Sequence, residues 1–492
     1  MRSSPFAALV FSAVCLGPAA AQDTTPNPVY GEKKAFPLPF THPAAQPEEL
    51  RDRRERLAAL MKDGVAVLVS DEIPSLYSGG RYRPGNNIHY FTGVETDFCA
   101  LVLTAKGGKL AAETLYLPAY DTSYELWNGK RAVADDAARA STGISDVVAL
   151  GASSLGDTYG AFETAFNALI DSGAVLFLEA GPAAGRARTK SLQLNAKTRA
   201  SMLRDHVQAR LADANKSSGD GDDDGKADPK KNRKPSEPSA KAKIKNLTTE
   251  AAKLRSIKSA HEIALLREAV RVTGEAYANA IPQIRPGMWE FEFDALMQGA
   301  FVAHGCTGLP YYPIAASGPN ACILHYSDSR RRMEEGDLFL SDIAAEWGWY
   351  AADVTRTFPV NGKFTPRQRL VYEAVLAGQT AAATILRPGV DWGTLDRECK
   401  AAMQAAGLKP SELQPHGLGH PVGLDVHDCG DQVMAPGMLV TIEPGSSLKK
   451  EGFGVRIEDV YLITETGNEC LSKGIPRSVA EVEAMTGRAH RK

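Results

Sequence analysis

The chain of 492 residues is long enough for two or more domains, each with a core of its own. Its hydrophobic content of 43% and its aromatic content of 7% are ordinary for a globular protein. The formal net charge of -3 gives no overall attraction to nucleic acid or to an anionic membrane surface, so any specificity must come from a local site.

Residues 1–21 have the features of a secretory signal: one arginine, an apolar run and a small-residue end, with cleavage expected before Gln22. The apolar run is too short to span a bilayer, and no later stretch reads as a transmembrane helix. The bulky Val14 directly before Cys15 argues against a lipid anchor. We therefore expect an exported protein, periplasmic or secreted, without stable membrane insertion. Its other cysteines contain no CxxC motif, although an exported protein could pair some of them.

Residues 45–212 are predicted to form a first α/β domain, because helices and strands alternate over a length within the usual domain range. Leucines at helical spacing form one stripe over residues 48–62, which predicts a helix there. Strands are expected at residues 65–70, 99–104, 114–118 and 175–178.

Residues 213–246 differ in composition from both neighbouring segments. They contain GDGDDDG followed by KKNRK, with almost no apolar side chain, which predicts a disordered insertion or linker. A calcium loop at 220–224 is disfavoured because the flanking helices and the terminal glutamate of an EF-hand are missing. Residues 247–492 are predicted to form a second domain, which begins with a helix over 249–278 and continues as alternating helices and short strands.

The segment PHGLGHPVGLDVHD at 415–428 concentrates three of the ten histidines: His416, His420 and His427. Its glycines and prolines break any helical period, so His416 and His420 are not a zinc-binding pair on one helix face. We expect an irregular turn that leads into a short strand over 423–427, with Asp425 and His427 on one face. Taken alone, this cluster fits histidines bonded to the backbone of a loop as well as it fits a binding site.

Carboxylates in apolar strands favour the binding site. Asp342 and Asp353 flank a predicted turn at 347–348, and a regular hairpin would place them opposite each other, with Cβ atoms about 4.5 to 5.5 Å apart. Such a pair destabilises a sheet unless a cation lies between the charges, a bulge separates them or one aspartate stays protonated. Glu443 and Glu458 also lie in or beside strand-like segments. Because an unpaired buried carboxylate costs on the order of several kcal/mol, four such acids near a histidine cluster indicate a metal site.

Five residues follow one another in a recognisable order along the second domain: Asp342, Asp353, His420 in HGLGHPVGLDVHD, Glu443 in TIEPG and Glu458 in VRIED. This order resembles the dinuclear metallopeptidases of the pita-bread fold, and among them the Xaa-Pro aminopeptidases (aminopeptidases P) and prolidases. The resemblance is strong over about residues 247–486 and weaker in the first domain, where RPGNNIHYFTG is similar to the N-terminal domain of that family. It implies an N-terminal α/β domain followed by a C-terminal pita-bread catalytic domain.

The resemblance also implies a hydrolase that uses two divalent ions to release the N-terminal residue from peptides with proline in second position. Asp342 would chelate one ion, while Asp353 and Glu458 would bridge the two. His420 and Glu443 would bind the second ion. Mn²⁺ suits this carboxylate-rich set, with Zn²⁺ or Co²⁺ as alternatives. The ions would lower the pKa of a shared water molecule, and Glu443 would take up its proton and pass it to the leaving nitrogen.

The remaining residues of the predicted site would contact the substrate. By resemblance, His427 would donate a hydrogen bond to the oxyanion or to the carbonyl of the scissile bond. His325, His416 and Arg456 would line the pocket for proline. A purely structural, hydrogen-bonded role is the alternative for each of them.

Two departures from the family pattern concern substrate contacts rather than metal ligands. Ser446 and Ser447 follow TIEPG where many aminopeptidases P have an aromatic residue, and His89 stands where some relatives have tryptophan. The first alternative function is therefore a prolidase, which would share every metal ligand. A metal-free relative of the creatinase type and a non-catalytic binding module typically lose ligands, whereas this chain keeps all five. A homo-oligomer, dimer or tetramer, is also expected.

Overall fold

The computed structural model describes residues 42–70, 83–96, 98–153, 156–157, 160–179, 243–413 and 416–490. The predicted signal at 1–21 and residues 213–242 of the predicted linker lie outside these ranges. From Pro43 onward the described residues belong to one compact unit, so the boundary between the two predicted domains stays a prediction.

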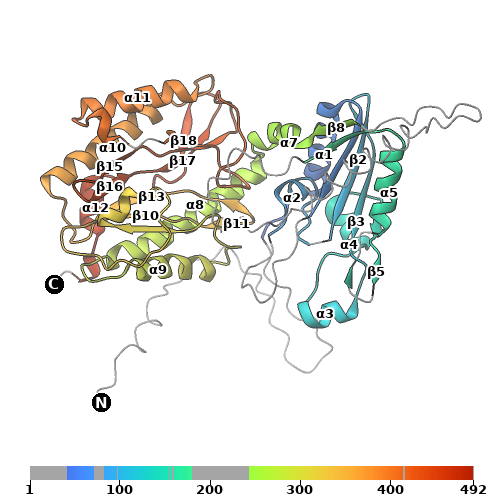
Figure 1. Cartoon of the computed structure of the whole chain (residues 1–492), viewed down its shortest axis with the longest axis horizontal. Coiled ribbons are helices and arrows are strands. Elements are labelled where there is room, and N and C mark those ends of the chain that lie inside the picture. The colour runs from blue at the N-terminus through green and yellow to red at the C-terminus, as the bar shows by residue number, and fades with distance from the viewer. Residues whose placement is uncertain are drawn as a thin grey trace, which may run out of the picture. The chain divides into compact units, whose positions relative to one another are not determined.

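The first half of the described chain is built on a mixed sheet with the strand order β4-β3-β2-β1-β7-β8 (Figure 1). Alternation along β1 divides its side chains between two hydrophobic clusters, because successive residues of a strand point to opposite faces. Leu68 shares a cluster with Leu57 of α1, whereas Val67 shares one with Phe166 of α5, so helices cover both faces of the sheet. The elements of this half are α1 (Pro47–Met61), β1 (Gly64–Val69), α2 (Asn86–Thr92), β2 (Ala100–Lys106), β3 (Lys109–Leu117), α3 (Thr122–Asn128), α4 (Asp136–Thr142), β4 (Val147–Ala149), β5 (Ala152–Ser153), β6 (Gly156–Asp157), α5 (Gly160–Asp171), β7 (Val175–Leu178) and β8 (Lys243–Asn246).

The helix and the four strands predicted for the first domain are confirmed as α1, β1, β2, β3 and β7. The prediction of a linker over 213–246 is wrong at its end, because Lys243–Asn246 form β8 beside β7. Ile244 packs against the cluster that contains α5, while Lys243 and Lys245 are exposed. One apolar residue between two lysines is typical of a strand at the edge of a sheet.

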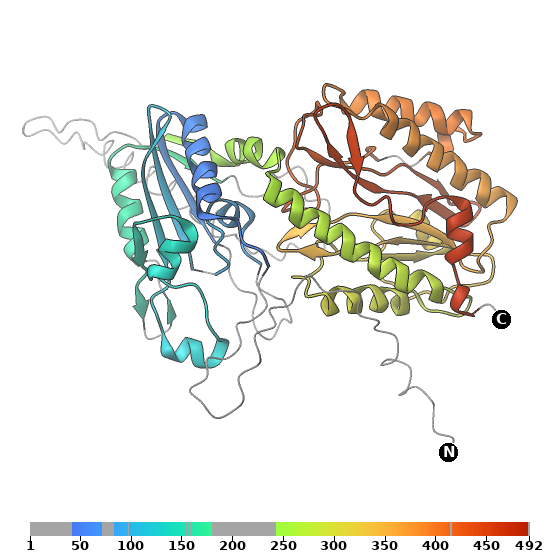
Figure 2. The ribbon, with the colours of Figure 1, turned by 180° about the vertical axis from the view of Figure 1, so that it is seen from behind.

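The second half contains two antiparallel sheets, β13-β10-β9 and β14-β17-β18, and two short ribbons, β11-β12 and β15-β16. Helices α8 and α9 lie beside the first sheet and α10 and α11 beside the second, as Figure 2 shows from behind. The elements are α7 (Leu247–Ser256), α8 (Ala260–Ala280), α9 (Glu290–Ala303), β9 (Ile314–Ser317), β10 (Leu338–Asp342), β11 (Glu346–Trp347), β12 (Tyr350–Ala351), β13 (Thr355–Pro359), α10 (Pro366–Ile385), α11 (Trp392–Ala405), β14 (Leu439–Ile442), β15 (Gly445–Leu448), β16 (Phe453–Arg456), β17 (Asp459–Ile463), β18 (Asn468–Cys470) and α12 (Val479–Met485), with short 3-10 turns η2 (Ile281–Gln283), η3 (Gly318–Cys322), η4 (Pro410–Glu412) and η5 (Arg488–His490).

The single helix predicted over 249–278 is in fact two helices, α7 and α8. Ile257 adopts an extended conformation and ends α7. Ser259 then caps α8: its hydroxyl accepts a hydrogen bond from the Glu262 amide, and the Glu262 carboxylate accepts one from the Ser259 amide. This reciprocal capping box has a sequence signature, serine followed three residues later by glutamate, that marks the second helix start.

The prediction that Asp342 and Asp353 lie opposite each other is wrong. The hairpin turns at Gly348–Trp349, where φ is 56° and 70°, one residue later than predicted. Two left-handed residues form the kind of tight turn whose twist matches that of the flanking strands. Because moving a turn by one residue shifts the pairing by two, Asp342 pairs with Thr355 and Asp353 lies outside the ladder, between β12 and β13.

The strand predicted over 423–427 is also wrong, because these residues form successive bends. The Asp428 amide donates to the Pro421 carbonyl at 2.9 Å and closes the segment into a loop. The Gly423 amide is used inside that loop, where it donates to the Asp425 carbonyl at 3.0 Å, and is not available to a neighbouring strand. In this loop Asp425 and His427 are exposed, whereas Leu424 is buried.

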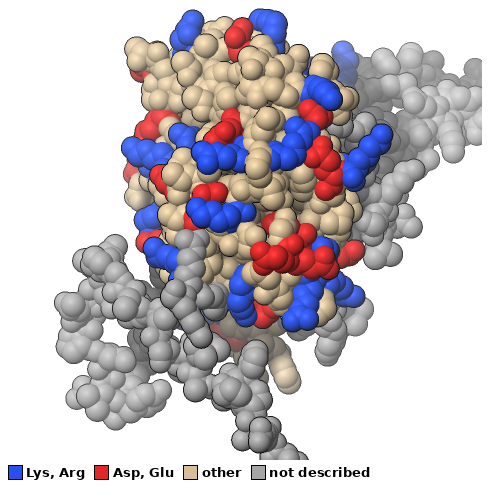
Figure 3. Space-filling model, turned by 90° about the vertical axis from the view of Figure 1, so that its left-hand side faces the viewer, with Lys and Arg blue, Asp and Glu red and all other residues tan. Residues whose placement is uncertain are grey.

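The described residues bear on three features of the sequence: apolar helices, cysteines and surface charge. Within them, no helix has both the length and the apolar character needed to cross a membrane. All six cysteines in this part of the chain are free thiols, so the pairing that we considered for an exported protein does not occur there. Basic and acidic side chains are interspersed over the face shown in Figure 3, which fits the small net charge.

Candidate metal centre

The histidine segment is docked against β14 through backbone hydrogen bonds and an isolated antiparallel bridge between Pro421 and Val440. The Thr441 amide donates to the His420 carbonyl at 2.8 Å, and the Glu443 amide donates to the Leu418 carbonyl at 2.8 Å. The His420 amide in turn donates to the Thr441 hydroxyl at 3.1 Å. Gly419 lies so close to this strand that an added Cβ would be 2.1 Å from the Thr441 carbonyl oxygen. A glycine is therefore required where the loop crosses β14, and this close approach fixes the position of His420.

The five residues predicted as metal ligands are brought together by contacts between neighbours. The Nε2 atom of His420 lies 3.3 Å from Oδ2 of Asp353 and 3.5 Å from Oε1 of Glu443. One ligand atom each from Asp353, His420 and Glu458 lies within 4.8 Å of the other two. Asp342 lies near enough to Asp353 for its charge to raise the pKa of Asp353. The cluster combines one aspartate at a strand end, one in a strand interruption, two glutamates beside strands and a loop histidine.

Burial and mutual repulsion raise the pKa values of three carboxyl groups in this cluster, those of Asp353, Glu443 and Glu458. Burial raises the pKa of Asp353 well above its usual value, and the charge of Asp342 raises it further. The pKa of Glu443 is raised by burial and by Glu458, and that of Glu458 by burial and by Asp353. Buried acids held this close are stable as carboxylates only when positive charge compensates them.

Glu458 offers the clearest test of whether a cation fits the cluster. One of its oxygens, Oε2, accepts a hydrogen bond from the Thr355 hydroxyl at 2.7 Å. The other, Oε1, is buried without a hydrogen-bond partner among the described residues. Oxygen-rich donor sets with one imidazole suit hard to borderline divalent ions. The free oxygen and the crowded acids around it therefore fit a divalent cation bound by this cluster.

Asp342 has two further partners, one predicted and one missed. Arg456, predicted to contact substrate, forms a 2.6 Å ion pair with Asp342. The Tyr311 hydroxyl donates to the other oxygen of Asp342 at 2.8 Å. Burial raises the pKa of Tyr311 well above its usual value, and the nearby acids raise it further, so the phenol stays a neutral donor. Nothing in the sequence around Tyr311 singled it out, because its contact depends on the pairing of β9 with β10.

Two of the three other predicted histidines contact residues of the cluster. The exposed ring of His427 stacks on that of His420, with 3.8 Å between centroids. Nδ1 of His416 lies 3.9 Å from the Glu443 carboxylate. The pKa of His416 is lowered to about 4, first by burial and then by the charges of Arg456 and His325, so its ring is neutral at physiological pH. His325 is exposed and follows η3.

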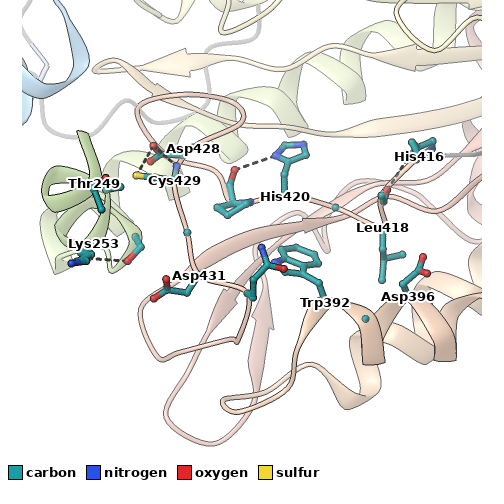
Figure 4. Close-up of a pocket in the computed structure, with 18 of the residues that line it drawn as sticks. Thr249, Lys253, Trp392, Asp396, His416, Leu418, His420, Asp428, Cys429 and Asp431 are labelled. Atoms are coloured by element: carbon teal, nitrogen blue, oxygen red, sulfur yellow. Dashed lines mark hydrogen bonds between the residues drawn. The ribbon is translucent and has the colours of Figure 1, made fainter. Parts of the chain in front are cut away.

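A cavity of about 760 Å³ adjoins the cluster on the side of α7 and α11 (Figure 4). His416 and His420 line it, but the four acidic ligands do not. Lys253 of α7 and Trp392 at the start of α11 form parts of its wall. The cavity therefore borders the metal cluster, and the histidine loop lies between the cavity and the four carboxylates.

The cluster has the donor set of a divalent-metal site, and two family models match the chain. Residues 264–465 match metallopeptidase family M24, and residues 50–154 match the aminopeptidase P N-terminal domain. The second half of the chain thus contains a segment similar to metallopeptidase family M24, and the first half contains one similar to the aminopeptidase P N-terminal domain. The predicted order of an N-terminal α/β domain and a C-terminal pita-bread domain is confirmed.

Curated relatives and solved structures agree with this assignment. The Xaa-Pro aminopeptidase of Escherichia coli is 37% identical over 262 residues, which cover 47% of this chain and 59% of that protein. The Xaa-Pro aminopeptidase 3 of Rattus norvegicus is 28% identical over 94% of this chain and 92% of its own length. Zinc-substituted E. coli aminopeptidase P in complex with product superposes with a TM-score of 0.75 and 28% identity, over 92% of this chain and all of that chain. In the E. coli sequence comparison, the chain thus spans about three fifths of its relative.

Proposed function

We propose that this protein is a metal-dependent Xaa-Pro aminopeptidase, which hydrolyses the bond before a proline in second position and releases the N-terminal residue. The observation that carries the proposal is the convergence of Asp353, His420 and Glu458 around one point, with a buried carboxylate oxygen that has no partner in the described chain. The names of the relatives supply the substrate class, since both the E. coli and the rat proteins are Xaa-Pro aminopeptidases.

The metal centre of the proposal contains two divalent ions. Asp342 would hold one ion, His420 and Glu443 would hold the other, and Asp353 and Glu458 would lie between them. Mn²⁺ is our first choice because carboxylate oxygens dominate the set, with Zn²⁺ or Co²⁺ as alternatives. Such ions lower the pKa of water and stabilise negative charge that develops during hydrolysis.

The remaining chemistry would fall to side chains of the chain itself. Burial and the neighbouring Glu458 raise the pKa of Glu443, which suits a group that accepts a proton from water and passes it to the leaving nitrogen. His427, exposed beside His420, would donate to the oxyanion of the substrate. His416, neutral and half-buried, would line the proline pocket together with His325 and Arg456.

Hydrolysis of matched peptides tests the proposal. Purified protein with Mn²⁺ should release the first residue of an Xaa-Pro-Xaa tripeptide, and a chelator or Asp353→Asn should abolish this release. Cleavage of the Xaa-Pro dipeptide alone would replace the proposal by a prolidase. No stoichiometric metal and no response to added Mn²⁺ would instead favour a metal-free enzyme or a binding module on the same fold.

The proposal includes export and self-association. Residues 1–21 would direct the chain out of the cytoplasm, so the mature protein should begin at Gln22 and be found in the periplasm or the medium. N-terminal sequencing of the fractionated protein measures this directly. The enzyme is proposed to form a homo-oligomer, a dimer or a tetramer, which light scattering of the purified protein would distinguish from a monomer.

A further inference from the structure

Gln379 of α10 is a fully buried side chain whose amide reaches the backbone beside two of the metal-site acids. Its Nε2 donates to the Ile442 carbonyl at 3.1 Å and to the Ile457 carbonyl at 3.2 Å. Ile442 directly precedes Glu443, and Ile457 directly precedes Glu458. One amide therefore bonds to the two peptide units from which both glutamates project.

The N–H groups of the same two peptide units are also hydrogen-bonded. The Glu443 amide donates to the Leu418 carbonyl of the histidine loop at 2.8 Å. The Glu458 amide donates to the Thr355 carbonyl at 3.0 Å. Each peptide plane is thus bonded on both sides, with Gln379 bonded to the carbonyl side of both. A fixed peptide plane restricts where the following glutamate carboxylate can lie.

The side-chain amide of Gln379 cannot move or rotate easily. Its helix packs tightly on α11 at the adjacent Gly378, where an added Cβ would lie 2.4 Å from Met403 and 3.0 Å from the sulfur of Cys399. Rotating the amide by half a turn would direct its oxygen at two carbonyl oxygens. The Oε1 of Gln379 is left buried without a partner among the described residues, an unfavourable arrangement for a buried polar atom. The orientation that bonds the two carbonyls is therefore kept although it leaves the oxygen unpaired.

We infer that Gln379 is a positioning residue, which sets the spacing of Glu443 and Glu458 in the metal centre. This inference rests on the proposed function, because the two glutamates are assigned there as metal ligands. Gln379 touches neither the ions nor the substrate; it acts through the backbone that carries the ligands. Loss of partners that orient metal ligands typically lowers metal affinity about 10- to 100-fold.

The test compares Gln379→Met, which keeps the length of the side chain but has no donor, with Tyr372→Phe. Tyr372 lies two turns earlier on the same buried helix face and donates to the Arg477 carbonyl at 2.8 Å instead of to the peptide units that precede the two glutamates. Both variants lose buried hydrogen bonds, so both should unfold at a lower temperature. Gln379→Met should bind Mn²⁺ about 10- to 100-fold more weakly by calorimetry and change the visible spectrum of the Co²⁺-loaded protein, whereas Tyr372→Phe should change neither.

Hydrogen exchange of the metal-free protein separates this inference from the proposed function. The Glu443 and Glu458 amides should lose protection in Gln379→Met, or in Gln379→Glu if the first variant does not fold. Unchanged protection, or Mn²⁺ affinity and a Co²⁺ spectrum equal to those of the wild type, would overturn the positioning role. A wild type that neither binds metal nor cleaves peptides would overturn the proposed function, even where exchange shows that Gln379 holds both strands.

Discussion

Replacing Gly419 by alanine should displace the histidine loop from the metal centre. The new Cβ would lie 2.1 Å from the Thr441 carbonyl oxygen and 3.0 Å from its hydroxyl. The carbonyl belongs to the backbone of β14 and cannot rotate away as a flexible side chain would. An ordinary contact begins at 3.4 Å, so the two atoms must separate by about 1.3 Å, the difference between these distances.

This separation of the two atoms is large compared with the distances between the candidate ligand atoms. His420 follows Gly419 directly, and its Nε2 lies 3.3 Å from the Asp353 carboxylate. A shift of about 1 Å in a catalytic group costs on the order of 100-fold in rate. We therefore expect kcat/KM for an Xaa-Pro-Xaa peptide to fall about 100-fold, which corresponds to about 2.7 kcal/mol of lost transition-state stabilisation. Overpacking should also lower the free energy of unfolding, by about 1 to 3 kcal/mol.

Gly417→Ala is the matched control, because it adds the same methyl group two residues earlier in the same loop. Its Cβ would meet only the Gly419 carbonyl oxygen, at 4.0 Å, an ordinary contact. Peptide hydrolysis and Mn²⁺ titration of both variants measure the difference. Equal activities in the two variants would refute the reasoning, because the loss would then not come from the contact with β14.

Three further predictions concern the partners of the site and its charges. Tyr311→Phe removes a hydrogen bond from Asp342 and should weaken Mn²⁺ binding by about 10-fold in calorimetry; unchanged affinity would contradict the role of the phenol. Adding Mn²⁺ to chelator-treated protein should raise its melting temperature, because ions that bind only the folded state stabilise it; a melting temperature independent of Mn²⁺ would argue against the centre. Burial alone would raise the pKa of Asp428, but Arg255 and Lys258 lower it below its usual value. Its contribution to stability is thus present above the unfolded-state pKa and is lost as the pH falls through the lowered pKa. Asp428→Asn should unfold more easily near neutral pH, by about 3 to 5 kcal/mol, and the difference from wild type should shrink in acid denaturation; a constant difference would contradict it.

The candidate ligands could be predicted from the sequence because their chemistry conflicts with their surroundings. Glu458 stands among valines and isoleucines, and the structure leaves it 1% exposed. A charged side chain in such a segment is stable only with compensating charge, so its presence signals a site before any contact is known. The histidine loop was recognisable for a related reason, since its glycines and prolines exclude a helix. These signals are local, and they survive errors in the predicted secondary structure.

Contacts that depend on pairing between distant segments could not be predicted in this way. The register of Asp342 and Asp353 depends on which two residues make the turn, and the sequence Trp-Gly-Trp allowed two choices. Tyr311 reaches Asp342 only because Ile314, three residues later, pairs with that aspartate in β9 and β10. Gln379 did carry a signal, a polar residue on the buried face of a helix rich in alanine and valine. Its partners, however, lie more than sixty residues away.

Tyr277 on α8 is placed much as Gln379 is on α10. Its buried hydroxyl lies 3.0 Å from the Ser341 carbonyl and 3.1 Å from the Val354 carbonyl, next in sequence to Asp342 and Asp353. Helices α8 and α10 therefore each contribute one buried polar side chain, and each of these side chains bonds to the two strand ends that carry a pair of acids. Four repelling carboxylates would otherwise relax by moving these strand ends apart. Because both pairs of strand ends are bonded to helices packed behind them, the acids are held close together, which favours binding of cations over separation of the strands.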